Sequence, residues 1–476
     1  MTETHQRTEH PAPPGTTTRR RKAVVLLLAC TAMGMANLDT AIVNIALPSI
    51  QSEFTVGRDT VQWVVVAYSL ILGGFLLVGG RTTDRLGRRR TFVTGITLMA
   101  SASLVAGMSG SAGVLIAARS GQGLGAALVI PAALSLLAAT FEEGPERDRA
   151  IGAFGAVGGI AGSFGVVVGG LLTAGPGWRW AFFINVPTGT ALVVLAAVVL
   201  SQDRDRDLDT PLDLGGATAV TGGLLLAVYG LHHATGHGWL TGSTAALMGG
   251  AAALLVVFAL LEARADVPLI PRPTWRNRTV VTANLAAFLA FAALFGFIFL
   301  GTLLMQQVMG YSPIRTGIAW LATTATVFVA AMAGGRLAGR VGLRRMLVTG
   351  LVLVAVGALL LTRVAADTDY ATGLVPAFVL IGVGFGLCGP AVQMAALTGV
   401  PAEQTGVAAG LIETTREIGG AAGVAFVTTA LVTSAGLAGF HAGFTLVAGL
   451  AVAGGLVASV GIRAPRPAAR ELLAAA

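Results

Sequence analysis

Apolar residues occur in this chain in long stretches, and short polar segments separate these stretches from one another. A helix that crosses the hydrocarbon core of a bilayer needs roughly 20 mostly apolar residues. With that window the sequence predicts about fourteen membrane spans, with boundaries good to about four residues. The predicted spans lie at 23–50, 61–80, 91–109, 112–139, 150–174, 181–200, 213–231, 241–262, 279–305, 316–334, 346–363, 370–396, 404–432 and 440–462.

Composition supports a membrane environment. Of the 476 residues, 54% are hydrophobic and 11% are charged, whereas a soluble domain carries about 25% charged residues. The 65 glycines are typical of helices that pack closely in lipid. The predicted fold class is therefore all-α, a polytopic membrane protein.

Connections that are rich in positive charge alternate along the chain with connections that hold little. One set of connections is rich in arginine, and the opposite set holds only Arg58, Arg179, Arg315 and Arg363. Cytoplasmic loops carry the excess of Lys and Arg, so both termini are predicted to lie in the cytoplasm. This topology accounts for the net charge of +8, and a nucleic-acid partner is not needed to explain it. A cleavable signal peptide after Arg19–Lys22 is the alternative, but the apolar stretch continues to Ile50 and is too long for one.

An internal repeat predicts the domain organisation. GRTTDRLGRRR at Gly80–Arg90 aligns without gaps on GRLAGRVGLRR at Gly335–Arg345, and each segment follows the second span of a six-span set. We expect two pseudo-symmetric six-helix bundles, at 23–200 and 279–462, and a two-helix insert with cytoplasmic linkers at 201–278. The segments 1–22 and 463–476 are predicted to be cytoplasmic tails, the first of them disordered. Parallel repeats of this kind place a substrate site near the bilayer midplane, between halves that rock.

Cysteine and histidine provide no metal or redox site. Cys30 and Cys388 lie in separate apolar stretches, and the six histidines have no metal-ligand spacing. We therefore expect no metal and no cofactor.

Two predicted spans of the first half contain charged residues. Asp39 lies in the first span, and Arg119 lies in the fourth span with Gln122 one turn later. A charge at the centre of a spanning helix costs roughly 2.5–3.5 kcal/mol on insertion scales. Each of these residues is expected to face a partner or a water-filled cavity. The alternative for both is a structural contact between helices.

The repeated segment combines glycines with charges. Gly80 and Gly87 permit a tight reversal, Asp84 is suited to a helix N-terminus, and the arginines, Arg85 and Arg88 among them, are suited to carbonyls and lipid phosphates. Positive-inside topology alone explains the arginines but not Asp84.

Two further predicted spans are unusual. The fifth span contains Gly165, Gly169 and Gly170, of which the first two form a GxxxG contact for a neighbouring helix. The thirteenth span contains Glu413, Arg416 and Glu417, which lie close together on a helix. The charged group is expected to handle protons or cations, and Glu413 would be the acid that does so if it faces the cavity and Arg416 neutralises Glu417. The alternative is a trio that neutralises itself.

These motifs resemble those of the major facilitator superfamily, in its fourteen-span drug:proton antiporter branch, over residues 23 to about 462. The resemblance implies that Asp39, Arg119 and Gln122 take part in proton or substrate coupling. It also implies that Gly80, Asp84, Arg85, Gly87 and Arg88 form a conformational latch against the segment near Pro401–Gly406, and that Gly165, Gly169 and Gly170 form the antiporter motif. The chain departs from the branch at Val166, where relatives have proline, and at Gly339, where the second copy lacks the acid.

The functional hypothesis is proton-coupled efflux of small amphipathic or cationic molecules by alternating access. The transporter is expected to act as a monomer in a bacterial cell membrane, with protons, lipid and a small molecule as partners. No GxxxxGK[ST] phosphate loop is present, so an ATP motor is not predicted. A proton-coupled importer of a metabolite is the alternative. A receptor or a membrane enzyme would need a soluble domain or a catalytic constellation, and the sequence shows neither, so an enzyme is not predicted.

Overall fold

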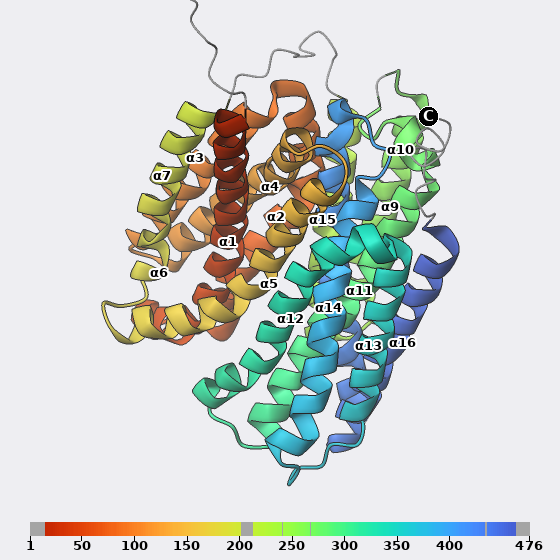
Figure 1. Ribbon diagram of the computed structural model, residues 1–476. Coiled ribbons are helices and arrows are strands. Elements are labelled where there is room, and N and C mark those ends of the chain that lie inside the picture. Colours follow the sequence, from red (N-terminus) through yellow and green to blue (C-terminus); the bar gives the residue numbers. More distant parts are fainter. Residues whose placement is uncertain (1–14, 201–212, 240, 267, 434–435, 463–476) are drawn as a thin grey trace, which may run out of the picture.

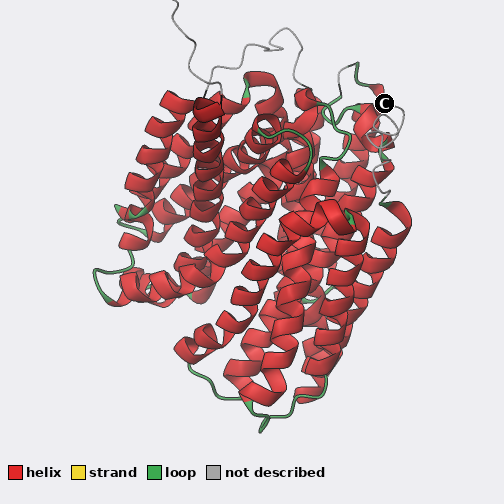
Figure 2. Cartoon of the chain, in the orientation of Figure 1, coloured by secondary structure: helices red, strands yellow, loops and turns green. Residues whose placement is uncertain are grey.

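The computed structural model describes residues 15–200, 213–239, 241–266, 268–433 and 436–462, and all regular structure within these ranges is helical (Figures 1 and 2). The helices of the first half are α1 (Gly15–Phe54), α2 (Arg58–Leu86), α3 (Arg88–Gly107), α4 (Ala112–Thr140), α5 (Pro145–Ala174), α6 (Trp180–Phe183) and α7 (Asn185–Val199).

The second half follows an intervening pair of helices, α8 (Leu214–His237) and α9 (Gly242–Arg264), and the short α10 (Arg272–Arg276). Its helices are α11 (Arg278–Leu303), α12 (Pro313–Val341), α13 (Leu343–Leu361), α14 (Val375–Ala396), α15 (Thr405–Thr433) and α16 (Leu437–Gly461). The π-helical segment Leu304–Val308 extends α11, a second one at Tyr370–Leu374 precedes α14, and the 3₁₀ turn Ala402–Gln404 precedes α15.

Helices overlap all of the apolar stretches that the sequence predicts. Within the described ranges, 11 helices are long and apolar enough to cross a membrane. α15 is not among these 11, because Glu413, Arg416 and Glu417 lie near its middle.

The N-terminal boundary differs from the prediction. α1 begins at Gly15 rather than at 23, so the tail predicted at 1–22 is partly helical. Lys22 donates to Glu146 at 2.7 Å and lies over the ring of Phe141, which anchors this turn to the start of α5. Residues 1–14 and the predicted tail 463–476 lie outside the described residues.

The two halves repeat one packing pattern. In the first half α1 packs on α5, α2 and α3 pack on α4, and α3 packs on α7. The same pairs recur in the second half, where α11 packs on α15, α12 and α13 pack on α14, and α13 packs on α16.

The halves meet along two seams, α2 against α15 and α5 against α12. The seams are not equivalent, because α8 lies across the first one and contacts both α2 and α15. Leu77 of α2, Leu224 of α8 and Val407 of α15 share one buried apolar cluster.

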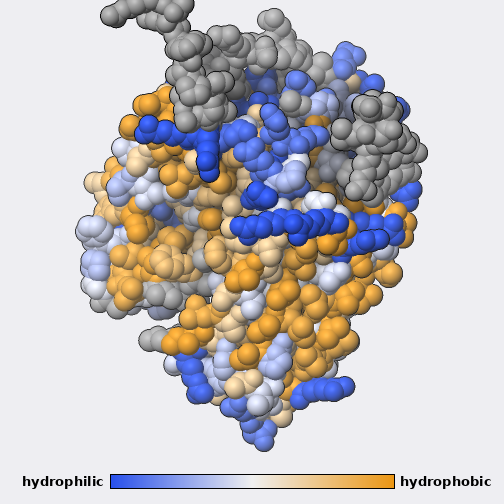
Figure 3. Space-filling view, viewed as in Figure 1, coloured by the Kyte–Doolittle hydropathy of each residue, from blue (hydrophilic) through white to orange (hydrophobic). Residues whose placement is uncertain are grey.

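The surface has the distribution that lipid requires. Large apolar side chains are exposed on the outer faces of several helices, among them Val198, Leu260, Val352 and Leu456. Figure 3 shows apolar surface over the body of the bundle and hydrophilic surface toward its upper end. The end of the bundle at which α2 and α12 end and α3, α5 and α13 begin is called the arginine-rich end, and it holds Arg85, Arg88, Arg147, Arg344 and Arg345.

Candidate functional site

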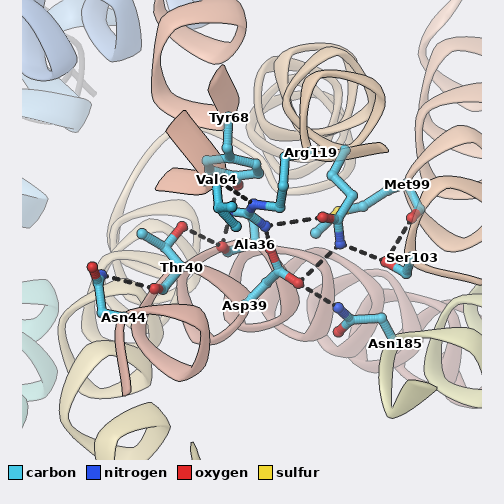
Figure 4. Close-up of polar contacts among 11 residues, drawn as sticks. Ala36, Asp39, Thr40, Asn44, Val64, Tyr68, Met99, Ser103, Arg119 and Asn185 are labelled. Carbon is cyan, nitrogen blue, oxygen red and sulfur yellow. Dashed lines mark hydrogen bonds and ion pairs between the residues drawn. The ribbon is translucent and has the colours of Figure 1, made fainter. Parts of the chain in front are cut away.

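The centre of the first half holds a buried ion pair. Asp39 of α1 and Arg119 of α4 are both fully buried, and an Arg119 Nη1–H donates to Asp39 Oδ2. The Arg119 Nε–H also donates to the Val64 carbonyl oxygen at 2.8 Å. The two charges lie 80 residues apart in the chain, and the contact between α1 and α4 brings them together (Figure 4).

Gln122 lies one turn after Arg119 and completes the α4 side of the site. Its Nε2 donates to Asp39 Oδ1 at 3.0 Å and to Ser103 Oγ at 2.7 Å, and its Oε1 accepts from Arg119 Nη1 at 2.9 Å. The structure thus brings Asp39, Arg119 and Gln122 into one hydrogen-bonded cluster.

Two further side chains belong to this cluster, and sequence reasoning did not select them as site residues. Asn185 Nδ2 donates to Asp39 Oδ1 at 2.6 Å, and the ring of Tyr68 lies 4.4 Å from the Arg119 guanidinium carbon. The Tyr68 hydroxyl donates to the Ala36 carbonyl oxygen at 3.2 Å. Asn185 could have been selected from the sequence, because it is a polar amide inside an apolar stretch.

The three hydrogen bonds around Asp39 are all donated to its carboxyl oxygens, an arrangement that suits an ionised carboxylate. Arg119, Gln122 and Asn185 all donate to it, and an ionised carboxyl group is acceptor-only. A proton on Asp39 would turn one acceptor into a donor and remove the counter-charge of buried Arg119, which is costly.

The second half has its own charged cluster in α15. Arg416 Nη1 donates to Glu413 Oε1 at 2.5 Å, and Gln393 Nε2 of α14 donates to the same oxygen at 3.1 Å. Arg416 also lies 4.2 Å from the ring centroid of Phe291. The sequence left open which of the two acids pairs with Arg416. In the structure Arg416 and Gln393 both donate to Glu413.

Glu417 is the less constrained of the two acids. Glu413 is 3% exposed, whereas Glu417 is half-buried beside Gly73 of α2. In the part of the chain that the structure describes, no hydrogen bond or ion pair holds the Glu417 carboxylate. Glu417 therefore lies at the α2/α15 seam, where Arg416 interacts with it electrostatically without a direct contact.

Asp84 joins the two halves at the arginine-rich end. Its Oδ1 accepts from the Gly406 backbone N–H at 2.7 Å, and its Oδ2 accepts from the Val407 N–H at 2.8 Å. These N–H groups belong to the first turn of α15, where helix geometry leaves donors unpaired and a negative charge is favourable.

Glycines bring α2 and α15 into backbone contact around Asp84. A Cβ at Gly80 would collide with the Gly406 carbonyl, and a Cβ at Gly410 would lie 2.6 Å from the Leu76 carbonyl oxygen. Gly87 has a φ of 96° and caps both α2 and α3, so it makes the predicted reversal. Arg85 is half-buried at the end of α2.

A second polar bridge crosses beside Asp84. Arg88 Nε–H donates to Ser135 Oγ at 3.0 Å, and Ser135 Oγ lies 2.7 Å from Thr405 Oγ1. Ser135 and Thr405 are both buried, so this bridge joins α3, α4 and α15 in the interior.

The α5/α12 seam has the glycines but not the acid. A Cβ at Gly152 would lie 3.1 Å from Gly335 Cα, and a Cβ at Gly335 would lie 2.9 Å from the Asp148 carbonyl oxygen. Gly339 occupies the position that corresponds to Asp84 in the repeat. At the α2/α15 seam the Asp84 carboxyl group therefore caps the N-terminus of the facing helix α15. At the α5/α12 seam Gly339 has no side chain that could make the corresponding cap.

The glycines of α5 divide between two faces. A Cβ at Gly165 would lie 2.6 Å from Ala41 Cβ, and one at Gly169 would lie 3.0 Å from Ile42 Cα. Both glycines pack against α1, whereas Gly170 has no atom near its Cβ position in the described residues. One residue turns a helix by 100°, so Gly170 lies outside the contact that the other two make.

The sequence matches the model of the Major Facilitator Superfamily over residues 29–424. The chain belongs to this superfamily. A puromycin resistance protein of Streptomyces alboniger is 38% identical over 82% of this chain and 78% of its own length. A cephamycin export protein of Amycolatopsis lactamdurans is 37% identical over 87% and 85%. A tetracenomycin C resistance and export protein of Streptomyces glaucescens is 34% identical over 84% and 74%.

The fold agrees with that membership. The crystal structure of the human organic anion transporter MFSD10 (TETRAN) superposes with a TM-score of 0.67 and covers 94% of this chain and 100% of its own, at 17% identity. The chain is thus a multi-pass membrane transporter rather than an enzyme, and its relatives carry names that refer to antibiotic resistance and export.

Proposed function

We propose that this transporter exports small amphipathic molecules, antibiotics among them, in exchange for protons. The buried Asp39–Arg119 pair carries the proposal, because a carboxylate inside a spanning helix can bind and release a proton and its burial makes that event structurally costly. Export is supported by the names of the relatives at 34–38% identity.

The energy released by proton entry is large enough to drive export. One charge moving through 100 mV releases about 2.3 kcal/mol. At 1.4 kcal/mol per tenfold ratio, one proton supports a concentration gradient of roughly 45-fold.

In this proposal the chain has fourteen spans, with α6 and α7 forming one of them. Both termini and the arginine-rich end lie in the cytoplasm, following the positive-inside rule. Asp84, Gly80 and the first turn of α15 then form a latch that seals the cytoplasmic side. Arg85, Gly87 and Arg88 shape and support that latch.

Glu417 adds a preference for cations. Its half-buried carboxylate at the α2/α15 seam favours a positively charged substrate, and a proton competes with that substrate for the same group.

Growth inhibition tests the export function. A host that expresses the transporter is compared with one that does not, across a panel that includes puromycin, lincomycin, a cephamycin and lipophilic dyes. Resistance to a subset of the panel that disappears when the proton gradient is collapsed supports the proposal. Increased sensitivity would instead indicate import.

A further inference from the structure

A helix break positions the third donor of the Asp39 cluster. The predicted span 181–200 is divided into α6 and α7 at Ile184, and α7 begins with Asn185. Pro187 follows two residues later, and its ring lacks an N–H and crowds the carbonyl four residues earlier, which disfavours a continuous helix. Asn185 thereby occupies a helix start inside the bundle, where it is 2% exposed.

The amide of Asn185 reaches Asp39 from a helix that carries no other part of the cluster. Its Nδ2 donates to Asp39 Oδ1 at 2.6 Å, and Gln122 donates to the same oxygen at 3.0 Å. The charged and titratable groups that face Asp39 are Arg119 on α4 and Tyr68 on α2. Glu417 of α15 lies beyond Tyr68, near enough to interact with it electrostatically.

Close packing prevents Asn185 from withdrawing by itself. One turn further along α7, a Cβ at Gly189 would lie 2.7 Å from Ala100 Cβ of α3. α7 also packs on α1. With α7 held in place, the hydrogen bond to Asp39 can be lost only if one of the two side chains rotates or α1 moves.

We propose that Asn185 is a positioning residue for proton coupling, which stabilises the ionised form of Asp39 and transmits its protonation to α7. A hydrogen bond donated to the charged form of an acid favours that form, and bonds to charged groups are stronger than neutral ones. When Asp39 takes up a proton, the Asn185 amide must turn its oxygen toward it or separate from it. This inference rests on the proposed titration of Asp39.

Infrared titration of the purified transporter tests the inference without a substrate. The carbonyl band of the protonated Asp39 carboxyl group is identified by its absence in Asp39→Asn, and its pH midpoint is compared among variants. Asn185→Ala removes one donor and is expected to move the midpoint to higher pH by about one unit. Asn185→Asp keeps the shape and adds a like charge, so it should move the midpoint further in the same direction.

The matched control is Asn37→Ala. Asn37 is a half-buried amide two residues from Asp39, and its Nδ2 donates to the Met33 carbonyl oxygen of its own helix. This variant should leave the midpoint at the wild-type value.

The outcomes separate the two claims. Unchanged midpoints in Asn185→Ala and Asn185→Asp, with Asp39 titrating normally, would overturn the role of Asn185. A wild-type midpoint in Asn185→Asp together with a shifted one in Asn185→Ala would show that only the shape of the side chain matters. Absence of any Asp39 band in the wild type would instead contradict the proposed proton coupling itself.

Discussion

At the scale of single residues, the decisive feature is the balance of charge around Asp39. Arg119 compensates its charge, while the amides of Gln122 and Asn185 supply hydrogen bonds without charge. Removing one partner of a buried pair leaves the other uncompensated, at a cost of about 3–5 kcal/mol. Transport and stability should therefore respond differently to substitutions at this pair.

Asp39→Asn is expected to abolish proton-driven export while the protein still folds and inserts, since it removes the titratable charge and keeps the side-chain size. The variant should also lose about 3–5 kcal/mol of stability, because Arg119 stays charged. Vesicle transport and thermal denaturation measure the two effects. The double variant Asp39→Asn/Arg119→Gln should regain part of the stability and none of the transport. Substantial proton-driven export by Asp39→Asn would exclude Asp39 as the coupling group.

The two acids of α15 should also behave differently. Glu417→Gln is expected to weaken binding of a lipophilic cation, such as tetraphenylphosphonium, by roughly tenfold, or on the order of 1.4 kcal/mol. A neutral compound should be affected little. Glu413→Gln is the matched control, and it should mainly lower thermal stability, because Arg416 loses the negative charge of its ion-pair partner. Equal losses for cationic and neutral compounds in Glu417→Gln would favour a structural role for this acid.

At the scale of elements, the proposed latch depends on the contact of α2 with the first turn of α15. Asp84 satisfies two backbone donors of α15 from the other half of the molecule. In the proposed cycle these bonds exist only while the cytoplasmic side is closed, so they would stabilise that state and not the open one.

Asp84→Ala should slow the transport cycle and leave substrate affinity in detergent little changed. Losing a helix cap costs about 1–2 kcal/mol, which changes the ratio of sealed to open states by roughly 5- to 30-fold. The control is Thr82→Ala, since the Thr82 hydroxyl donates to Val78 of its own helix at 2.8 Å. Lost binding with a preserved cycling rate would contradict a latch.

A disulfide across the same seal provides a second test. In a background of Cys30→Ser and Cys388→Ala, the pair Ser135→Cys and Thr405→Cys should cross-link on oxidation, because the two hydroxyl oxygens lie 2.7 Å apart. The cross-link should arrest transport, and reduction should restore it, whereas each single cysteine should have no such effect. Full transport by the cross-linked protein would show that this seam does not open during the cycle.

At the scale of the whole molecule, hydrophobicity predicted the helices well because lipid imposes one length and one surface on each of them. The boundary at Gly15 and the break at Ile184 were missed, since they depend on Lys22 meeting Glu146 and on the local effect of Pro187. Such features arise from contacts or from single residues rather than from mean hydropathy.

The candidate site was predictable only in part. A charge in an apolar stretch identified Asp39 and Arg119, but nothing in their spacing indicated that they form a pair. For a related reason the sequence could not predict which acid pairs with Arg416. Helical spacing allows both acids, and Gln393 of α14, which the sequence does not connect with α15, stabilises Glu413 in that position.

Proton movement in proteoliposomes tests the central claim most directly. The transporter is reconstituted with a pH-sensitive dye inside, and a gradient of a compound chosen from the growth panel is applied across the membrane. The account predicts that the compound moving down its gradient drives protons in the opposite direction, and that Asp39→Asn abolishes this proton flux. Compound movement without proton flux in the wild type, or equal proton flux in Asp39→Asn, would contradict the account.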